Sequence, residues 1–317
     1  MNNEVILIVD AMNLFIRHYI RHPGMSLHGH HTGGIIGSLN ALAGLIELLQ
    51  PKTVYVVWES GGNARRRALL PDYKRNRKPP KLNRYYEGDI PDTAENRVHQ
   101  IKVLVNMLEL LGVCQFFVED CEADDIIGYL CRNTFLKEKK VIASSDRDFY
   151  QLIDDITMQY SWSSKKFIDP VAVKIETGVI PANFVVARTF VGDASDNIPG
   201  VKGVGFKTLL KRIPQLTGDK ELLVRDIINH CEIHRKTGLK VYEKLCEHAA
   251  DASRNWRLMY LDVSSLAAQQ IRKVDAVVED FKPSLDKMKL MRMMLDEGLP
   301  TFNTHDLFST FLTLRRT

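Results

Sequence analysis

The stretch KKVIASSDRD, residues 139–148, joins a short apolar run to two closely spaced carboxylates. The run has the length and continuous hydrophobicity of a strand that is buried on both faces of a parallel sheet. Asp146 and Asp148 follow at its carboxyl end, with only Arg147 between them. Two carboxylates in such a position repel each other and lose hydration, so we expect something positive to neutralise them.

The same kind of apolar run recurs along the first half of the chain. The other runs lie at 5–10, 53–58, 113–118 and, with a weaker pattern, 156–161. Segments with helical spacing lie between them, at 35–49, 94–111 and 122–137. Alternating strands and helices are typical of an α/β fold with a mostly parallel sheet flanked by helices, in which ligands bind at the carboxyl ends of the strands.

Beyond about residue 170 the strand signal fades, and helices with Gly and Pro punctuation continue to the end of the chain. We therefore expect an α/β part over 1–169 and a helical part over 170–317. Within the first part, Pro and Gly interrupt the stretch 79–93, which makes it the best candidate for an irregular element.

The composition, 45% hydrophobic and 26% charged over 317 residues, is that of a globular protein and excludes a disordered chain. No apolar run approaches the length of a membrane span, and the N-terminus enters a strand pattern without a basic leader, so we expect no membrane partner. Five cysteines, an odd number without a CxxC pair, indicate reduced thiols. These features predict a cytoplasmic protein.

Acidic residues gather at the predicted strand ends. Asp10 ends the first strand, Glu59 follows the second, and EADD at 122–125 follows the third. The full set is Asp10, Glu59, Glu122, Asp124, Asp125, Asp146, Asp148, Asp193 and Asp196. Any one of them could simply cap a helix or face solvent. Together at one rim they would repel one another strongly, and divalent cations would offset that repulsion.

All-oxygen ligands without nearby histidine or thiolate favour Mg²⁺ or Mn²⁺ over zinc or copper. The segment HGHH at 28–31 could suggest zinc, but its Gly neighbours and the absence of Cys or acid at ligand spacing favour an exposed loop. A pocket that holds two hard ions suits phosphodiester hydrolysis, in which one ion activates water and the other stabilises the leaving oxygen.

Positive charge is concentrated between Arg65 and Arg84, where nine basic residues accompany one acid, Asp72. The whole chain carries a net charge of only +4, so the remainder is mildly acidic. A concentrated basic block of this kind favours a polyanion such as a phosphate backbone. The alternative is a solvated face or a flexible charged loop.

A second basic feature is the stretch DNIPGVKGVGFKTLLKRI at 196–213. Gly200, Gly203 and Gly205 allow a tight turn with exposed amides, and the basic helix that follows would point its positive end at whatever those amides hold. A phosphate fits this description. The alternative is an ordinary corner between two helices, in which the glycines serve only the backbone.

Several motifs together resemble the flap endonuclease and 5′-3′ exonuclease family, which includes stand-alone phage and bacterial nucleases and the nuclease domain of bacterial DNA polymerase I. They are DAMNL at 10–14, VVWE at 56–59, LLPDYKRNRK at 69–78, EADD at 122–125, SSDRD at 144–148 and GDASDNIPGVKGVGFKT at 192–208. The motifs stand in the family's order, and the resemblance extends from about residue 4 to about 260.

The resemblance implies a PIN-like α/β nuclease core, a helical arch at about 79–98, and a helix–hairpin–helix at about 185–213. It also implies a magnesium-dependent (or manganese-dependent), structure-specific 5′ nuclease with two ions. Such an enzyme cleaves flapped or forked DNA, and the RNA of RNA–DNA hybrids, in replication or repair. The family further allows a potassium ion at the helix–hairpin–helix, a single-strand-binding protein or sliding clamp as partner, and a monomer.

Residue roles follow from the same resemblance. Asp10, Glu59 and Asp124 would serve the first ion, and Asp124, Asp146, Asp148 and Asp193 the second. Glu122, Asp125 and Asp196 would act close by or through water. Lys74 and Arg77 would contact the scissile phosphate, and Tyr73 would stack on a base. The expected DNA contacts are Arg65, Arg66, Arg67, Lys78, Gly200, Lys202, Gly203, Gly205 and Lys207.

One departure from the family pattern falls on an expected ligand. Glu59 stands where the family usually has Asp, so its longer side chain would shift the first ion or bind it through water. No polymerase domain follows, so we expect a stand-alone form, such as a phage replication enzyme. The tail at 296–312 is expected to pack a last helix on the core. The remaining alternatives are a non-cleaving nucleic-acid-binding protein of the same fold and a PIN-type ribonuclease.

Overall fold

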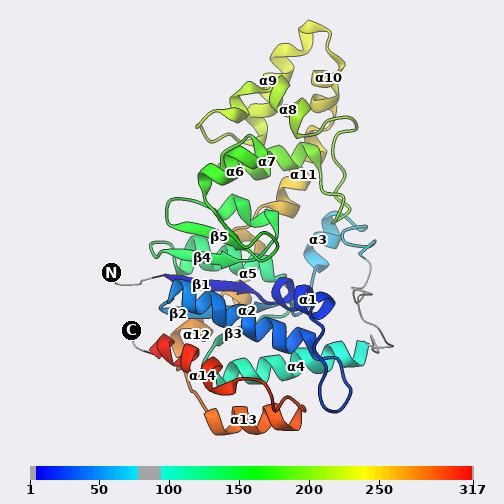
Figure 1. Cartoon of the computed structure of the whole chain (residues 1–317). Coiled ribbons are helices and arrows are strands. Elements are labelled where there is room, and N and C mark those ends of the chain that lie inside the picture. The colour runs from blue at the N-terminus through cyan, green and yellow to red at the C-terminus, as the bar shows by residue number, and fades with distance from the viewer. Residues whose placement is uncertain (1–4, 78–93, 316–317) are drawn as a thin grey trace.

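The computed structural model describes residues 5–77 and 94–315 and centres on one six-stranded sheet with the order β3-β2-β1-β4-β5-β6 (Figure 1). The strands are β1 (Ile6–Asp10), β2 (Thr53–Trp58), β3 (Cys114–Phe117), β4 (Lys140–Ala143), β5 (Thr157–Ser161) and β6 (Lys166–Ile168). All neighbouring pairs are parallel except β5 with β6. The predicted mostly parallel sheet is confirmed. The sequence missed β6, because its three residues are too few to show a period.

Both faces of the sheet are covered, as the uninterrupted apolar strands require. Leu7 and Val9 point into a core formed with α1 (Ala11–Arg21), α2 (Gly33–Leu49) and α4 (Ala94–Leu110). Ile6 and Ile8 point the other way, into a core formed with α5 (Ala123–Tyr129) and α12 (Ala268–Asp280). The helix expected at 122–137 is shorter in the structure, because α5 passes into a single π turn, Leu130–Thr134.

A separate core holds most of the helical half of the chain, above the sheet in Figure 1. Its helices are α6 (Pro170–Thr177), α7 (Pro181–Val191), α8 (Phe206–Arg212), α9 (Val224–His234), α10 (Lys240–Glu247) and α11 (Ala249–Met259). Tyr73 and Tyr150 from the first half also contribute to this core. The two halves are therefore joined by shared side chains as well as by the chain.

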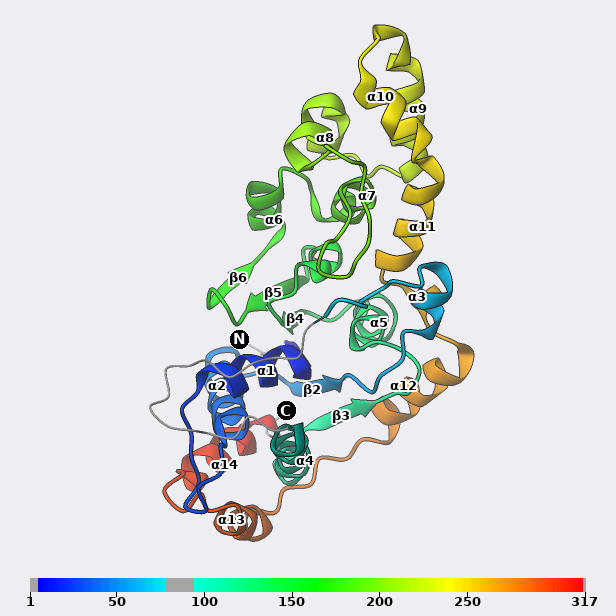
Figure 2. The same cartoon turned by 90° about the vertical axis from the view of Figure 1, so that its right-hand side faces the viewer.

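The helices after α11 leave this core and return to the α/β half of the chain. The division predicted at residue 170 placed them in the helical part instead. Helix α12 packs on one face of the sheet (Figure 2). Helices α13 (Lys287–Asp296) and α14 (Thr304–Leu312) pack on α4 and α2, which cover the other face. Phe311 of α14 is fully buried there. The expectation that the tail packs a last helix on the core is confirmed.

One described segment, Pro170–Val191, is long and apolar enough to cross a membrane by length and composition, with a mean hydropathy of 1.3. The expectation that no apolar run approaches the length of a membrane span is wrong for this segment. In the structure it forms two helices, because α6 ends at Gly178, whose φ of 82° is left-handed, and α7 begins again at Pro181. Phe184 and Phe190 of α7 are buried in the core of the helical half. The segment is thus part of a folded core.

Candidate active site

The carboxyl edge of the sheet brings together acids that are far apart in the chain. Asp10 ends β1 and caps α1, accepting hydrogen bonds from the Asn13 amide (3.0 Å) and the Ser144 hydroxyl (2.9 Å). Asp146, just beyond the neighbouring strand β4, accepts one from the Asp148 amide (2.9 Å). A cavity of about 750 Å³ opens at this edge. The acids that line it are Asp10, Glu59, Glu122, Asp124 and Asp146.

Burial and mutual repulsion disfavour the charged forms of these acids. Burial raises the pKa of Asp10 to about 6, and the charges of Asp146 and Glu59 add to the shift. Burial also raises the pKa of Asp124 well above its ordinary value, again reinforced by Asp146 and Asp10. Asp10, Glu59, Asp124 and Asp146 form no ion pair with any residue that the structure describes. We refer to these four as the unpaired acids.

Glu59 is one of the unpaired acids, although the resembled family usually has Asp at this position. Its side chain accepts a hydrogen bond from the amide of Ala123 (3.1 Å), at the start of α5. Burial raises its pKa, an effect that this bond partly opposes and that Glu122 reinforces. The longer side chain therefore reaches the beginning of α5 and still lines the cavity.

A second group of carboxylates lies between β4 and α7. Asp148, Asp193 and Asp196 each place one oxygen within 4.8 Å of the others. Burial raises the pKa of Asp148 to about 7, and Asp146 adds to this shift. The pKa of Asp193 is lowered, because the Ser195 hydroxyl and the Arg188 guanidinium outweigh its partial burial. We refer to these three as the second acid group.

The donor set matches hard divalent cations. The acids here offer carboxylate oxygens, no histidine or cysteine lines the cavity, and none of the unpaired acids has an ion-paired cation among the described residues. Oxygen-rich, highly charged sites of this kind suit magnesium or manganese. The sequence-based expectation of a negative hollow at the strand ends is therefore matched by the structure for the unpaired acids.

Arg66 and Asp125 do not fit the roles expected of them. Arg66 was predicted to contact DNA, but it is only 8% exposed, and its guanidinium forms two hydrogen bonds of 2.7 Å to the two carboxylate oxygens of Asp125. Its Nε donates to the carbonyl of Leu258 in α11 (2.9 Å). Both oxygens of Asp125 are thus engaged inside the protein. These two residues form a structural pair behind the cavity.

Tyr73 also differs from its expected role. It was predicted to stack on a base, but it is 3% exposed and belongs to the core of the helical half. Its hydroxyl donates to Glu122 (3.0 Å) and lies 3.3 Å from an oxygen of Asp196. Burial, together with these two acids, raises the pKa of the phenol. Tyr73 therefore contacts Glu122 and Asp196 from the protein interior and helps to fix their side chains.

Lys74 and Arg77 line the cavity, as a contact with phosphate requires. Lys74 donates to Glu122 (2.8 Å), and Arg77 donates to Asp196 (2.6 Å). Burial lowers the pKa of Lys74, but Glu122 and Asp196 outweigh this effect and raise it. Both cations are therefore held charged beside the acids. They also explain why Glu122 and Asp196, unlike the unpaired acids, have positive partners.

The other residues expected to contact DNA belong to the basic block or to the glycine turn, and they differ in exposure. Arg65, Arg67, Lys202 and Lys207 are exposed, and Arg67 also lines the cavity. Lys78, and most of the expected arch at 79–98, lie outside the described residues.

The three glycines of the turn differ in what they do. A Cβ on Gly200 would lie 2.0 Å from the carbonyl oxygen of Val191, so this glycine is required by backbone packing. Gly203 has a φ of 83°, which favours glycine for conformational reasons. Gly205 precedes α8 and has open space around it. Of these three glycines, only Gly205 is required neither by backbone packing nor by a left-handed φ.

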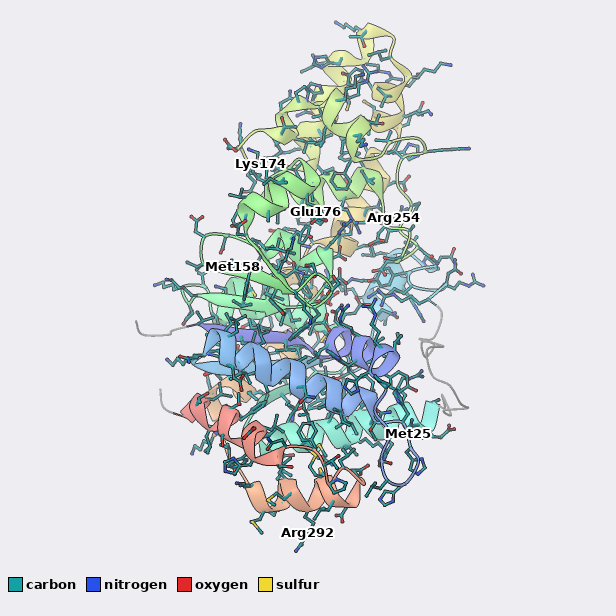
Figure 3. All side chains as sticks on the ribbon, viewed as in Figure 1. Met25, Met158, Lys174, Glu176, Arg254 and Arg292 are labelled. Carbon is teal, nitrogen blue, oxygen red and sulfur yellow. The ribbon has the colours of Figure 1, made fainter. Side chains whose placement is uncertain are left out.

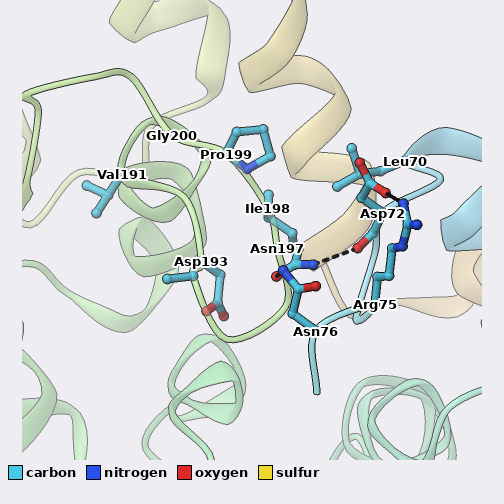
Figure 4. Close-up of a pocket in the computed structure, with 11 residues that line it drawn as sticks. Leu70, Asp72, Arg75, Asn76, Val191, Asp193, Asn197, Ile198, Pro199 and Gly200 are labelled. Atoms are coloured by element: carbon cyan, nitrogen blue, oxygen red, sulfur yellow. Dashed lines mark hydrogen bonds and ion pairs between the residues drawn. The ribbon is translucent and has the colours of Figure 1, made fainter. Parts of the chain in front are cut away.

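The turn is attached to the basic block across a groove of about 820 Å³ (Figure 4). The side chain of Asn197 donates through Nδ2 to the carbonyl of Asp72 (3.0 Å) and accepts through Oδ1 from the side-chain Nδ2 of Asn76 (3.3 Å). The Lys74 amide donates to the carbonyl of Asp196 (3.0 Å). These bonds fix the basic block against the loop that carries the second acid group.

Sequence reasoning missed Arg188, on the last turn of α7. Its guanidinium forms an ion pair with Asp193 and lies 3.5 Å from Asp148. No spacing rule reveals this contact, because Asp148 is 40 residues away in the chain and meets α7 only in the fold. The one sequence signal for such a residue was the closely spaced pair Asp146 and Asp148, whose mutual repulsion predicts a positively charged partner.

An acidic, all-oxygen hollow flanked by fixed cations provides what metal-dependent hydrolysis of a phosphodiester requires. Fold and site together thus define a divalent-metal-dependent nuclease. Residues 5–178 match the family described as 5′-3′ exonuclease, N-terminal resolvase-like domain. This match covers more than half of the chain, so the chain belongs to the 5′-3′ exonuclease family.

Relatives support this membership. A 5′-3′ exonuclease of Bacillus subtilis (strain 168) is 32% identical over 223 residues, which make up 67% of this chain and 71% of that protein. The DNA polymerase I of Pseudomonas aeruginosa is 30% identical over 261 residues, 81% of this chain but only 27% of the polymerase. The chain thus corresponds to about a quarter of the polymerase.

Solved structures show the same fold. The T5 D15 protein co-crystallised with metal ions has a TM-score of 0.71 at 19% identity, covering 88% of this chain and 100% of that one. The bacteriophage T5 D15 flap endonuclease in complex with DNA and metal ions has a TM-score of 0.66 at 19% identity and covers 98% of this chain and 100% of that one. The predicted PIN-like fold of the flap endonuclease type is confirmed.

Proposed function

We propose that this chain is a divalent-metal-dependent 5′-3′ exonuclease and flap endonuclease that hydrolyses phosphodiesters of flapped or forked DNA. One observation carries the proposal: the unpaired acids share a single cavity with Lys74 and Arg77. A negative hollow alone would repel nucleic acid, and a basic patch alone would only bind it. The combination provides both metal ligands and phosphate contacts. The 5′-3′ exonuclease relatives support the direction of attack.

In this function the first ion would bind among the unpaired acids, at Asp10, Glu59 and Asp124, and the second would bind Asp124, Asp146, Asp148 and Asp193. When bound, the ions would supply an activated water and neutralise charge at the phosphate. Lys74 and Arg77 bind and orient the scissile phosphate, because they are already charged and held at the cavity wall by Glu122 and Asp196. Arg66 and Tyr73 keep Glu122 in place and so maintain the position of Lys74.

Finer features belong to the same proposal. The ions are Mg²⁺ or Mn²⁺, two in number, because the ligands are all oxygen and form two groups. The turn at 200–205 contacts duplex DNA, and a potassium ion at the helix–hairpin–helix assists it. RNA–DNA hybrids are further substrates. The enzyme acts as a cytoplasmic monomer in replication or repair, alongside a single-strand-binding protein or a sliding clamp.

The test is cleavage of an end-labelled 5′-flap DNA with product mapping, in Mg²⁺ and in chelator. Wild-type protein should release the flap near the junction only with Mg²⁺, and Asp146→Asn should reduce the rate by at least about 10³-fold while duplex binding persists. Undiminished cutting by this variant would refute the proposal. Binding without turnover would favour a non-cleaving binding protein, and preference for an RNA hairpin over the flap would favour a PIN-type ribonuclease.

A further inference from the structure

The carboxylates at the rim fall into two groups according to their positive partners. The unpaired acids, defined above, have none among residues 5–77 and 94–315. Every member of the second acid group has one, since Arg77 pairs with Asp196 and Arg188 contacts both Asp193 and Asp148. The two groups therefore offer an incoming cation very different surroundings.

Arg188 is built into this position. It lies on the last turn of α7, where the helix dipole favours a positive charge, and its side chain is 17% exposed. Its Nε is buried without a hydrogen-bond partner, and its Nη2 contacts the carboxylates of Asp193 and Asp148. The guanidinium also lies 5.8 Å from the ring centroid of Phe184, which limits where it can move.

A guanidinium between two carboxylates supplies the charge that a divalent ion would supply. The oxygens of Asp148, Asp193 and Asp196 lie close enough to hold one ion, but the Arg188 guanidinium already donates to one oxygen of Asp193 and lies beside one of Asp148. An ion can bind there only by replacing these contacts. No such replacement is required at the unpaired acids.

We propose that Arg188 is a resident counter-cation of the second acid group that competes with the second metal ion and makes metal binding sequential. The first ion binds tightly to the unpaired acids. The second binds weakly until Arg188 leaves Asp148 and Asp193, and a phosphate of bound DNA is an acceptor to which the freed guanidinium can turn. This inference rests on the proposed function, since it assigns Arg188 to the metal sites of that reaction.

The experiment measures Mn²⁺ binding to the full chain by isothermal titration calorimetry, without DNA and therefore without turnover. The wild type should show two classes of site whose dissociation constants differ by at least about tenfold. Arg188→Gln should tighten the weaker class by about tenfold, because the ion pairs of Arg188 with Asp193 and Asp148 no longer have to be broken. The tighter class should change by less than about twofold.

The matched control is Arg254→Gln on α11, labelled in Figure 3. Arg254 is also partly buried, pairs with Asp251 at 2.8 Å and has a buried Nε without a partner, but it does not contact the rim acids. Its loss should leave both classes of Mn²⁺ site unchanged. If Arg188→Gln does not fold, Arg188→Lys provides a second test, since a shorter cation without the guanidinium fork should tighten the weaker class by about threefold.

Unchanged or weakened Mn²⁺ binding at the weaker class in both Arg188 variants would overturn the inference, as would an equal effect of Arg254→Gln. Failure of the proposed function would appear separately. In that case wild-type protein would not cleave flap DNA, whereas the effect of Arg188 on Mn²⁺ binding would still be measurable.

Discussion

Arg66 and Asp125 meet through two parallel hydrogen bonds of 2.7 Å in a site where both side chains are almost completely buried. Removing one charge from such a pair leaves the other buried without compensation, which costs about 3–5 kcal/mol. Arg66→Met should therefore lower the free energy of unfolding by this amount, measured by urea denaturation. Arg65→Met, the exposed neighbour, should change it by less than about 0.5 kcal/mol. Similar small effects of both variants would show that the pair is not structural.

The pKa shifts of Asp10 and Asp148 predict a pH dependence of metal binding. Burial raises these pKa values from 3.8 to about 6 and about 7, so the folded protein binds more protons than the unfolded chain in this range. The metal-free protein should accordingly lose stability as pH rises from about 4 to about 7. Mg²⁺ requires the ionised carboxylates, so the increase in Tm on adding Mg²⁺ should grow over the same range.

Melting curves in chelator and in millimolar Mg²⁺, recorded between pH 5 and pH 8, would measure this effect. Asp10→Asn should reduce the Mg²⁺-dependent increase at neutral pH, because one of the unpaired acids is lost. An increase in Tm that is the same at every pH would contradict the assignment of buried, proton-binding carboxylates to the metal site.

The strand ends were predictable because the positions of their acids follow from topology alone. Asp10, Asp124 and Asp146 lie at or just beyond parallel strands, and such ends must meet at one edge whatever the side chains around them do. The apolar runs locate the strands, whereas the order of the strands in the sheet was not predicted. This part of the site needed no knowledge of tertiary contacts.

The partners of those acids could not be predicted in the same way. Arg66 lies in a run of three arginines, and nothing local distinguishes it from its exposed neighbours. Its burial depends on Asp125 and on the carbonyl of Leu258, 192 residues away. Tyr73 is similarly fixed by Asp196 from the second half of the chain. The segment with the basic block, which the sequence suggests is one exposed surface, thus contributes Arg66 and Tyr73 to the interior.

Tyr73→Phe separates a structural role from base stacking. The substitution keeps the ring but removes the hydroxyl that bonds to Glu122 at 3.0 Å. We expect the free energy of unfolding to fall by about 1–2 kcal/mol, since a hydrogen bond to a charged group is lost. Tyr260→Phe is the matched control, because no hydrogen bond of its hydroxyl occurs in the described structure. A stable Tyr73→Phe protein with weakened DNA binding would instead support contact with the substrate.

Gly200 and Gly205 provide the sharpest comparison within the glycine turn. Gly200→Ala forces a Cβ to within 2.0 Å of the Val191 carbonyl oxygen, so we expect a loss of about 2–3 kcal/mol of stability. Gly205→Ala meets no atom within 4 Å and should change stability by less than about 1 kcal/mol. If the Gly205 backbone approaches a phosphate, however, the same variant should weaken duplex binding by about tenfold, as measured by fluorescence anisotropy. Unchanged duplex affinity in Gly205→Ala would show that this backbone does not contact DNA.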